Sequence, residues 1–121
     1  MPGEKEDAAC LWDMLDAARS VQLFIARRTF HDYAHDRLLR NAVERNVEII
    51  GEAARGVSVS CREAHADIPW RGIIAQRHVL AHDYGEIDDE RVWIVATRFI
   101  PELIQKLEPL VAELAGPDSS F

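Results

Sequence analysis

The sequence predicts an all-α fold, an antiparallel bundle of four to five helices. Apolar residues recur at spacings of three and four along most of the chain, as in helices that bury one face. Only 6 glycines and 5 prolines occur in 121 residues, which favours long regular elements. One alternating segment, residues 57–60, is too short and isolated to build a sheet, and we expect it to be a loop.

The first two predicted helices cover residues 7–28 and 33–55, with residues 30–33 as a loop and cap between them. Asp7 can cap the first helix and Gly56 can close the second. The expected inner face of the first helix consists of Leu11, Met14, Leu15, Ala18, Val21, Gln22 and Ile25. That of the second consists of Leu38, Leu39, Ala42, Val43, Val47, Ile50 and Ala54, with Arg37, Arg40, Glu44 and Glu48 on the outer face.

Two further helices are predicted in the second half of the chain. The third should begin near Pro69, since proline suits a first helical turn, and should end between Ala81 and Tyr84. The fourth should begin at the three acids 88–90, which suit the positive end of a helix, and continue to residues 116–117. Pro101 lies inside this last helix and should kink or split it.

Length and composition predict one domain over residues 1–121, with residues 1–6 and 117–121 as flexible ends. The formal net charge is -7, whereas a protein that binds nucleic acid over a broad surface is usually basic. Any RNA contact must therefore be local, transient or shared with a second subunit. Two cysteines, a polar start and no apolar run of about 18 residues favour a cytoplasmic protein without a membrane span.

Reactive side chains are concentrated in one short segment that contains Arg77, His78, His82 and Tyr84. An arginine can hold the charge that develops on a phosphate, and a histidine can move protons, so the pair suits phosphodiester cleavage without a metal. Each residue alone is more often structural: a surface arginine, a helix-capping histidine, a packing tyrosine. The functional interpretation therefore depends on the residues acting together.

Helix geometry constrains how Arg77 and His82 could meet. Five residues correspond to about 140° of rotation, so the two side chains do not share a face of a regular helix. They can converge if the helix ends between them, if the arginine stem wraps back, or if a two-fold axis joins two copies. We favour a homodimer with a frayed last turn, which would place two arginines and two histidines in one cleft.

Two other groups of residues were candidates for a site. His31 and His35, like His78 and His82, are four apart and could bind a metal, but no cysteine or suitably spaced carboxylate accompanies them. We therefore expect neither a metal nor another cofactor.

A second candidate group lies in the second predicted helix. Gly51 favours close helix packing, and Glu48 and Glu52 could face Arg77 and orient it.

The motif Arg77-His78-x-x-x-His82-x-Tyr84 resembles the Arg-polar-x-x-x-His-x-Tyr signature of HEPN-domain proteins, specifically the HepT-like toxins. Residues 49–53 (IIGEA), residues 68–70 (IPW) and residues 87–93, with Ile87, Asp88, Val92 and Trp93, support the resemblance. It spans most of the chain, from the second predicted helix onward. One departure is His78, since asparagine is common at that position.

The resemblance implies a dimeric helical bundle that acts as a metal-independent ribonuclease toxin of a type VII-like toxin–antitoxin system. Arg77 and His82 would be catalytic, with His78 in support. The implied partner is an MntA-like nucleotidyltransferase antitoxin that transfers AMP to Tyr84, in an assembly of the dimer or larger. RNA chemistry predicts a 2′,3′-cyclic phosphate product. The alternative is a non-catalytic helical subunit that binds a nucleotidyltransferase.

Overall fold

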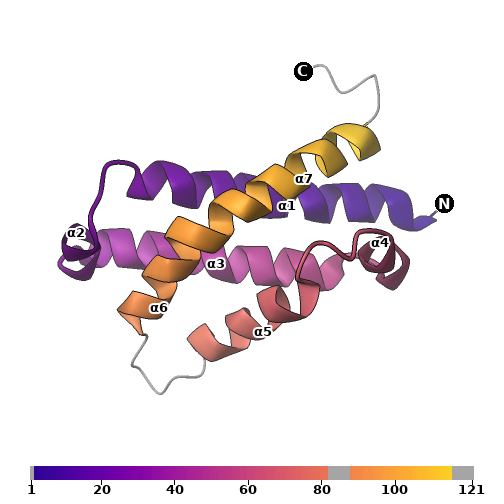
Figure 1. Ribbon diagram of the computed structural model, residues 1–121. Coiled ribbons are helices and arrows are strands. Elements are labelled where there is room, and N and C mark those ends of the chain that lie inside the picture. The colour runs from indigo at the N-terminus through magenta and orange to yellow at the C-terminus, as the bar shows by residue number, and fades with distance from the viewer. Residues whose placement is uncertain (1, 82–87, 116–121) are drawn as a thin grey trace.

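The computed structural model describes the backbone of residues 2–81 and 88–115, and the side chains of residues 6–75 and 88–114. Every element in these ranges is helical, as the sequence predicted (Figure 1). In chain order they are α1 (Pro2–Ile25), α2 (Phe30–Ala34), α3 (Arg37–Gly56), α4 (Val59–Ala64), α5 (Trp70–Ala81), α6 (Asp89–Ile94), the π-helical segment η1 (Val95–Phe99) and α7 (Ile100–Ala115).

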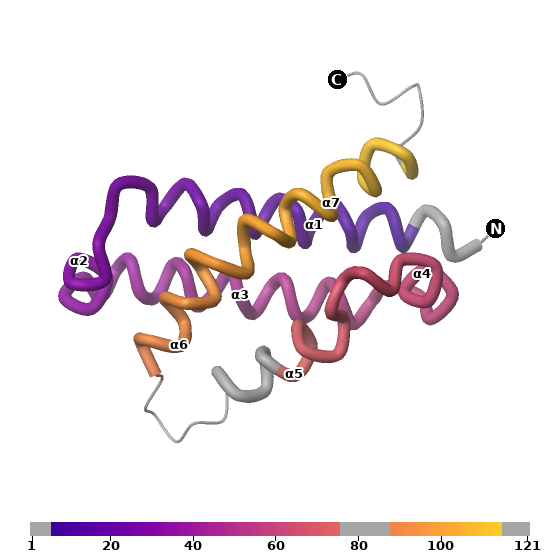
Figure 2. The backbone as a smooth tube through the Cα atoms, in the orientation of Figure 1, coloured from indigo at the N-terminus to yellow at the C-terminus, as the bar shows by residue number. Residues whose placement is uncertain are grey.

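Three long helices form the centre of the bundle. α1 and α3 lie side by side and antiparallel, and α7 crosses over them (Figure 2). α5 packs on another side of α3 and runs antiparallel to it. The short helices occupy the two ends: α2 and α6 lie at one end, and α4 lies at the other, where α1 begins and α7 finishes (Figure 1).

The apolar stripes predicted from the sequence form the core. Leu11, Met14, Ala18, Val21 and Val43 are fully buried, and α7 and the shorter helices add further members to the core. Burying a side chain as large as leucine or valine stabilises a domain by about 1.5–3 kcal/mol. Two residues predicted on inner faces are exceptions: Gln22 of α1 is exposed, and Leu38 of α3 is 80% exposed.

The boundaries of α1 differ from the prediction at both ends. The helix begins at Pro2, upstream of Asp7, so Asp7 is not its cap. Instead the Asp7 carboxylate is buried and accepts hydrogen bonds from the backbone N–H and hydroxyl of Ser58, at 2.7 and 2.6 Å. The helix ends at Ile25 rather than Arg28, because Arg27 adopts a left-handed conformation with φ of 62°.

The segment predicted as one helix over residues 33–55 is two helices. Residues 30–33, expected as a loop, belong to α2. Thr29 and Asp32 cap the start of this helix with a reciprocal capping box. α3 starts afresh because the backbone of Asp36 is extended and its carboxylate accepts from the N–H of Leu39 at 3.1 Å. Gly56 is the last residue of α3, as the sequence indicated.

Residues 57–60 are only partly a loop. Ser58 is the N-cap of α4, where its hydroxyl accepts from the N–H of Cys61, so Val59 and Ser60 are helical. α5 is described from Trp70 to Ala81, in agreement with the predicted third helix.

The predicted fourth helix is interrupted, close to where Pro101 suggested. It begins at Asp89 after an Asp88 N-cap, as predicted, and the described part reaches Ala115. Between α6 and α7 lies the π-helical turn η1, immediately before Pro101. Proline has no N–H for the carbonyl four residues earlier, here Thr97, so a widened turn at this point has a direct cause.

No helix in the described ranges is both long enough and apolar enough to span a membrane.

Candidate active site

The predicted catalytic segment lies at the junction between α5 and α6. Arg77 and His78 are in the last turns of α5, where the backbone but not the side chains is described. His82 and Tyr84 lie outside the described residues. The proposed convergence of Arg77 with His82 therefore stays a prediction.

Both helices that flank the segment are anchored to the bundle. α5 packs against α3, and α6 packs against α2. The start of α6 is fixed because the Asp88 carboxylate accepts from the N–H of Arg91 at 3.2 Å. Tyr84 precedes Asp88 by four residues, so chain connectivity alone keeps their Cα atoms within about 14 Å.

The acidic residues expected to orient the arginine lie on α3 and pair with Arg45 of the same helix. Arg45 Nη1 is 3.1 Å from a carboxylate oxygen of Glu48 and 3.9 Å from one of Glu52. Both are surface pairs of the kind that contributes up to about 1 kcal/mol. A role for Glu48 or Glu52 toward Arg77 stays a prediction.

An aromatic cluster joins α2 to α6 beside the start of the fourth predicted helix. The ring centroid of Trp93 is 5.4 Å from that of Tyr33 and 6.3 Å from that of Phe30, and both pairs are tilted. Tilted rings at such distances attract each other by about 0.5–1.5 kcal/mol beyond burial. The cluster holds α6 against the α2 end of the bundle.

A set of polar residues that the sequence did not reveal surrounds Tyr33. The Tyr33 side chain is fully buried, and its hydroxyl has no hydrogen-bond partner among the described residues. Burial raises the pKa of Tyr33 far above its ordinary value, and the charges of Glu44 and Asp89 raise it further. The guanidinium of Arg40 opposes this shift and donates to the carbonyl oxygen of Ala34 at 2.6 Å.

Glu44 belongs to the same group rather than to the solvated outer face predicted for it. Burial, assisted by Asp89, raises the pKa of its carboxyl group. Sequence periodicity places Glu44 beside the buried Val43, but the charge of Asp89 acts on it only because α6 packs against α2. A sequence pattern within one helix could not reveal that influence.

The paired histidines His31 and His35 are brought together, with ring centroids 4.2 Å apart. His35 Nδ1 lies 2.9 Å from the carbonyl oxygen of His31, which fixes the second ring over the first. Within the part of the chain that has described side chains, no three metal-ligating residues gather in one place.

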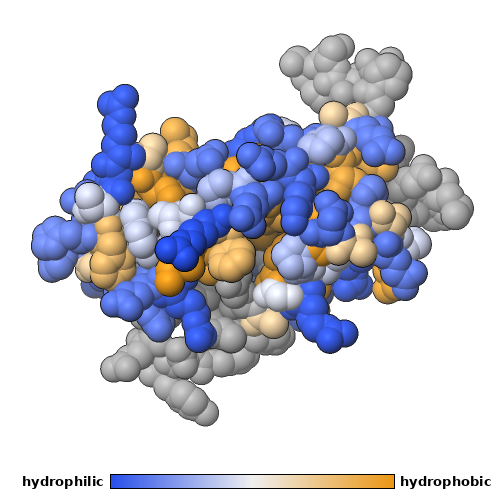
Figure 3. All heavy atoms as spheres, viewed as in Figure 1, coloured by the Kyte–Doolittle hydropathy of each residue, from blue (hydrophilic) through white to orange (hydrophobic). Residues whose placement is uncertain are grey.

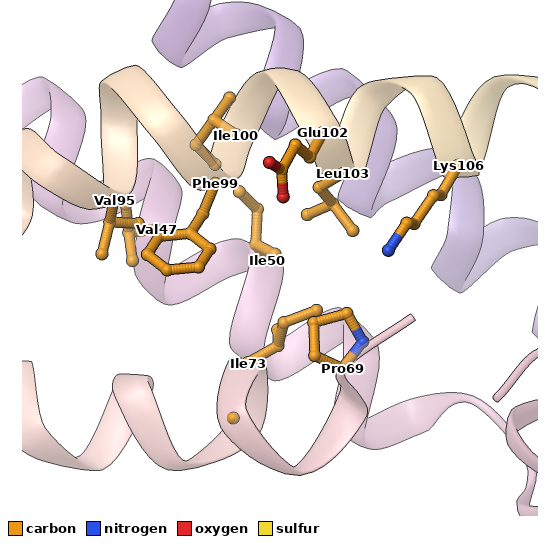
Figure 4. Close-up of a pocket in the computed structure, with 11 residues that line it drawn as sticks. Val47, Ile50, Pro69, Ile73, Val95, Phe99, Ile100, Glu102, Leu103 and Lys106 are labelled. Atoms are coloured by element: carbon orange, nitrogen blue, oxygen red, sulfur yellow. The ribbon is translucent and has the colours of Figure 1, made fainter. Parts of the chain in front are cut away.

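An apolar cavity of about 230 Å³ lies between α3, the first turns of α5, and the η1–α7 segment (Figure 4). Its walls are formed mainly by aliphatic residues and Phe99, and the charged residues are Glu102 and Lys106. The Lys106 ammonium donates to the backbone oxygen of Asp67 at 2.7 Å.

Comparison with known proteins identifies the family. The family model described as "Ribonuclease HepT-like" matches residues 14–110, which include the whole motif segment. The chain belongs to the HepT-like ribonuclease family.

Individual relatives agree with the family match. "Probable ribonuclease HepT" of Thermococcus cleftensis is 33% identical over 100 residues, which cover 83% of this chain and 91% of the relative. "Putative RNase MJ1380" of Methanocaldococcus jannaschii is 30% identical over 105 residues, covering 87% and 96%. "Putative RNase MJ0127" of the same organism is 27% identical over 117 residues, covering 97% of both chains. No solved structure gives a significant match.

Membership in the HepT-like family confirms the resemblance derived from the motif and the all-α fold expected with it. The family match also runs through the second half of α1, all of α3 and α5, and most of α7. The helices that carry and flank the motif are thus part of the conserved family domain, and not an addition to it.

Proposed function

We propose that this protein is a metal-independent endoribonuclease that acts as the toxin of a type VII-like toxin–antitoxin system. The observation that supports this most directly is the presence of Arg77, His82 and Tyr84, at the family's spacing, within a HepT-like ribonuclease domain. The helix anchoring on both sides of the motif segment adds support, because catalytic groups need a fixed frame.

In the proposed reaction the RNA supplies its own nucleophile. The 2′-hydroxyl attacks the neighbouring phosphorus, and His82 accepts the hydroxyl proton as the new O–P bond forms. Arg77 binds the nonbridging oxygens, where negative charge increases in the transition state. The bond to the 5′-oxygen then breaks and that oxygen takes up a proton. The products are a 2′,3′-cyclic phosphate and a 5′-hydroxyl, and His78 provides a further hydrogen-bonding group beside Arg77.

We also propose that the active form is a homodimer. Two motif segments facing each other across a two-fold axis would bring two guanidinium groups to one phosphate-binding cleft. The acidity of the chain supports this arrangement, since a single copy has little positive charge to attract RNA.

The proposed regulator is an MntA-like nucleotidyltransferase antitoxin. It would join the AMP group of ATP to the phenolic oxygen of Tyr84 and release pyrophosphate. The added phosphate carries negative charge, and the nucleoside adds bulk, two residues from His82. Both effects would exclude the RNA backbone from the cleft, in the same way that phosphorylation blocks anion-binding sites.

Cleavage of a labelled single-stranded RNA in excess EDTA tests the catalytic proposal. The unmodified protein should produce cyclic-phosphate ends, and Arg77→Ala and His82→Ala should each lower the rate by about 10²-fold or more. Arg71→Ala is the matched control, since Arg71 is exposed on the same helix and should leave the rate unchanged. Activity that disappears in EDTA and returns with a divalent ion would contradict the mechanism.

Intact mass after coexpression with the nucleotidyltransferase tests the regulation. We expect the mass of one AMP group on the wild-type chain and none on Tyr84→Phe. If neither the modified nor the unmodified protein cleaves RNA or slows growth, while the nucleotidyltransferase still binds, the non-catalytic binding subunit is the better interpretation.

A further inference from the structure

Positive charge is concentrated in one segment of this acidic protein. The chain as a whole has 14 lysines and arginines against 21 acids, but residues 27–40 contain four arginines against two aspartates. Among them Arg27, Arg28 and Arg37 have exposed side chains, as do His31 and His35. We call these five residues the basic corner. Hydrophilic side chains project from this end of the molecule, which carries α2 (Figure 3).

The two aspartates of this segment are held against backbone N–H groups. The Asp32 carboxylate accepts from the N–H of Thr29 at 2.9 Å, and this hydrogen bond is the main cause of its lowered pKa. The Asp36 carboxylate accepts from the N–H of Leu39 at the start of α3. Both negative charges therefore face the positive ends of helices, which compensate them, while the arginines of the corner extend into solvent.

The corner also presents two exposed imidazole rings. The centroids of His31 and His35 are 4.2 Å apart and their planes are inclined by 30°, and the hydrogen bond between the second ring and the first residue's carbonyl oxygen fixes the pair. Exposed imidazole rings are platforms on which unpaired nucleobases stack. Exposed arginines together with such rings are the combination used to hold single-stranded nucleic acid.

The basic corner lies on the same end of the bundle as α6, which follows the motif segment in the chain. α2 contacts α6 through the Trp93 ring cluster, and the charge of Asp89, the first residue of α6, acts on Tyr33 of α2. Because Tyr84 is only four residues before Asp88, a strand of a few nucleotides could reach from the corner to the motif.

We propose that the basic corner is the surface that binds the backbone of the single-stranded RNA substrate beside the cleavage site. This inference rests on the proposed function, since it assigns a substrate-binding surface to the same nuclease. An acidic protein partner is the competing occupant. RNA is favoured because the corner combines exposed guanidinium groups with a stacked pair of rings, whereas an acidic protein surface would need only the charges.

The test measures binding of a fluorescein-labelled single-stranded RNA by anisotropy, in a His82→Ala background so that no cleavage occurs. Log Kd for a single strand changes by about 0.7 per phosphate contact for each tenfold change in salt, so one contact contributes about fivefold at about 0.1 M salt. Arg37→Gln should weaken binding about fivefold. Arg28→Gln combined with Arg37→Gln should weaken it about 25-fold and lower the salt slope by about 1.4.

Arg55→Gln is the matched control. Arg55 is exposed on the same helix as Arg37 but 18 residues away, about 27 Å along the axis and at the α4 end. Its removal should change the affinity by less than twofold. Equal losses for Arg37→Gln and Arg55→Gln would show a general charge effect and overturn the proposal. Thermal melting of each variant, expected to match the parent, excludes misfolding as the cause.

Two further results separate this inference from the proposed nuclease activity. If the wild-type protein cleaves RNA but the double variant, made in the wild-type chain, binds and cleaves RNA normally, the basic-corner proposal is wrong and the nuclease proposal stands. If the wild-type protein binds RNA through the corner but never cleaves it, the basic-corner proposal stands and the nuclease proposal is wrong. A double variant that keeps its RNA affinity but loses the nucleotidyltransferase would assign the corner to the protein partner and overturn the proposal.

Discussion

Replacing Asp7 with alanine should strongly destabilise the bundle, because Asp7 connects α1 to the start of α4. Its side chain is 7% exposed, and its carboxylate accepts two short hydrogen bonds from Ser58, at 2.7 and 2.6 Å. A hydrogen bond to a charged group contributes about 1.5–3 kcal/mol. Desolvation of the carboxylate and the better helix propensity of alanine offset part of the total, so we expect a loss of about 2–3 kcal/mol.

The assay for Asp7→Ala is urea unfolding followed by circular dichroism, with Asp16→Ala as the control. Asp16 is exposed on the same helix, and its replacement should change the unfolding free energy by less than about 0.5 kcal/mol. Asp7→Asn should fall between the two, because the amide keeps one acceptor oxygen and turns a second donor toward Ser58. If Asp7→Ala is as stable as Asp16→Ala, the carboxylate does not hold α4 in place and the reasoning is refuted.

Three other substitutions give distinct results in the same assay. Tyr33→Phe removes a buried hydroxyl without a described partner, so stability should be unchanged or rise by about 1 kcal/mol; a clear loss would reveal an unseen partner. Gly56→Ala would place a Cβ 2.8 Å from Cys10 Sγ and should cost about 1–3 kcal/mol, which Cys10→Ala in the same chain should largely restore. Because burial raises the pKa of Glu44 in the folded state, its ionisation opposes folding as pH rises; Glu44→Gln should be more stable than wild type near neutral pH, and the advantage should vanish as pH falls toward the ordinary carboxyl pKa of about 4.3.

The sequence predicted the helical secondary structure and most of the buried faces correctly, because both depend on local periodicity. It located the start of the last helix correctly, because the capping hydrogen bond joins Asp88 to Arg91, only three residues later. It failed where a boundary depends on one backbone angle or on a distant partner. The left-handed Arg27 ends α1 early, and Asp7, which looks like a cap, bonds instead to Ser58, 51 residues away.

The candidate site shows the same division between local and long-range information. The motif and its family could be predicted from the sequence because Arg77, His82 and Tyr84 are close in sequence and their spacing is specific. The group around Tyr33 was not, because Glu44 and Asp89 meet it only through the packing of α2, α3 and α6. The same packing sets the basic corner beside α6, although each of its residues looks like an ordinary surface charge.

The position of the motif also explains how an acidic chain could act on RNA. A net charge of -7 repels phosphate at long range, so productive contact requires positive charge concentrated at the site of chemistry. The basic corner and α6, which follows the motif in the chain, lie at the same end of the bundle. Since the Trp93 cluster packs α6 against α2, and α6 follows the motif in the chain, we expect that disrupting the cluster reduces RNA affinity even though no charged residue is changed. Trp93→Ala tests this in the anisotropy assay. If the variant stays folded and keeps full affinity, then the corner and the motif do not depend on α6 for their relative placement.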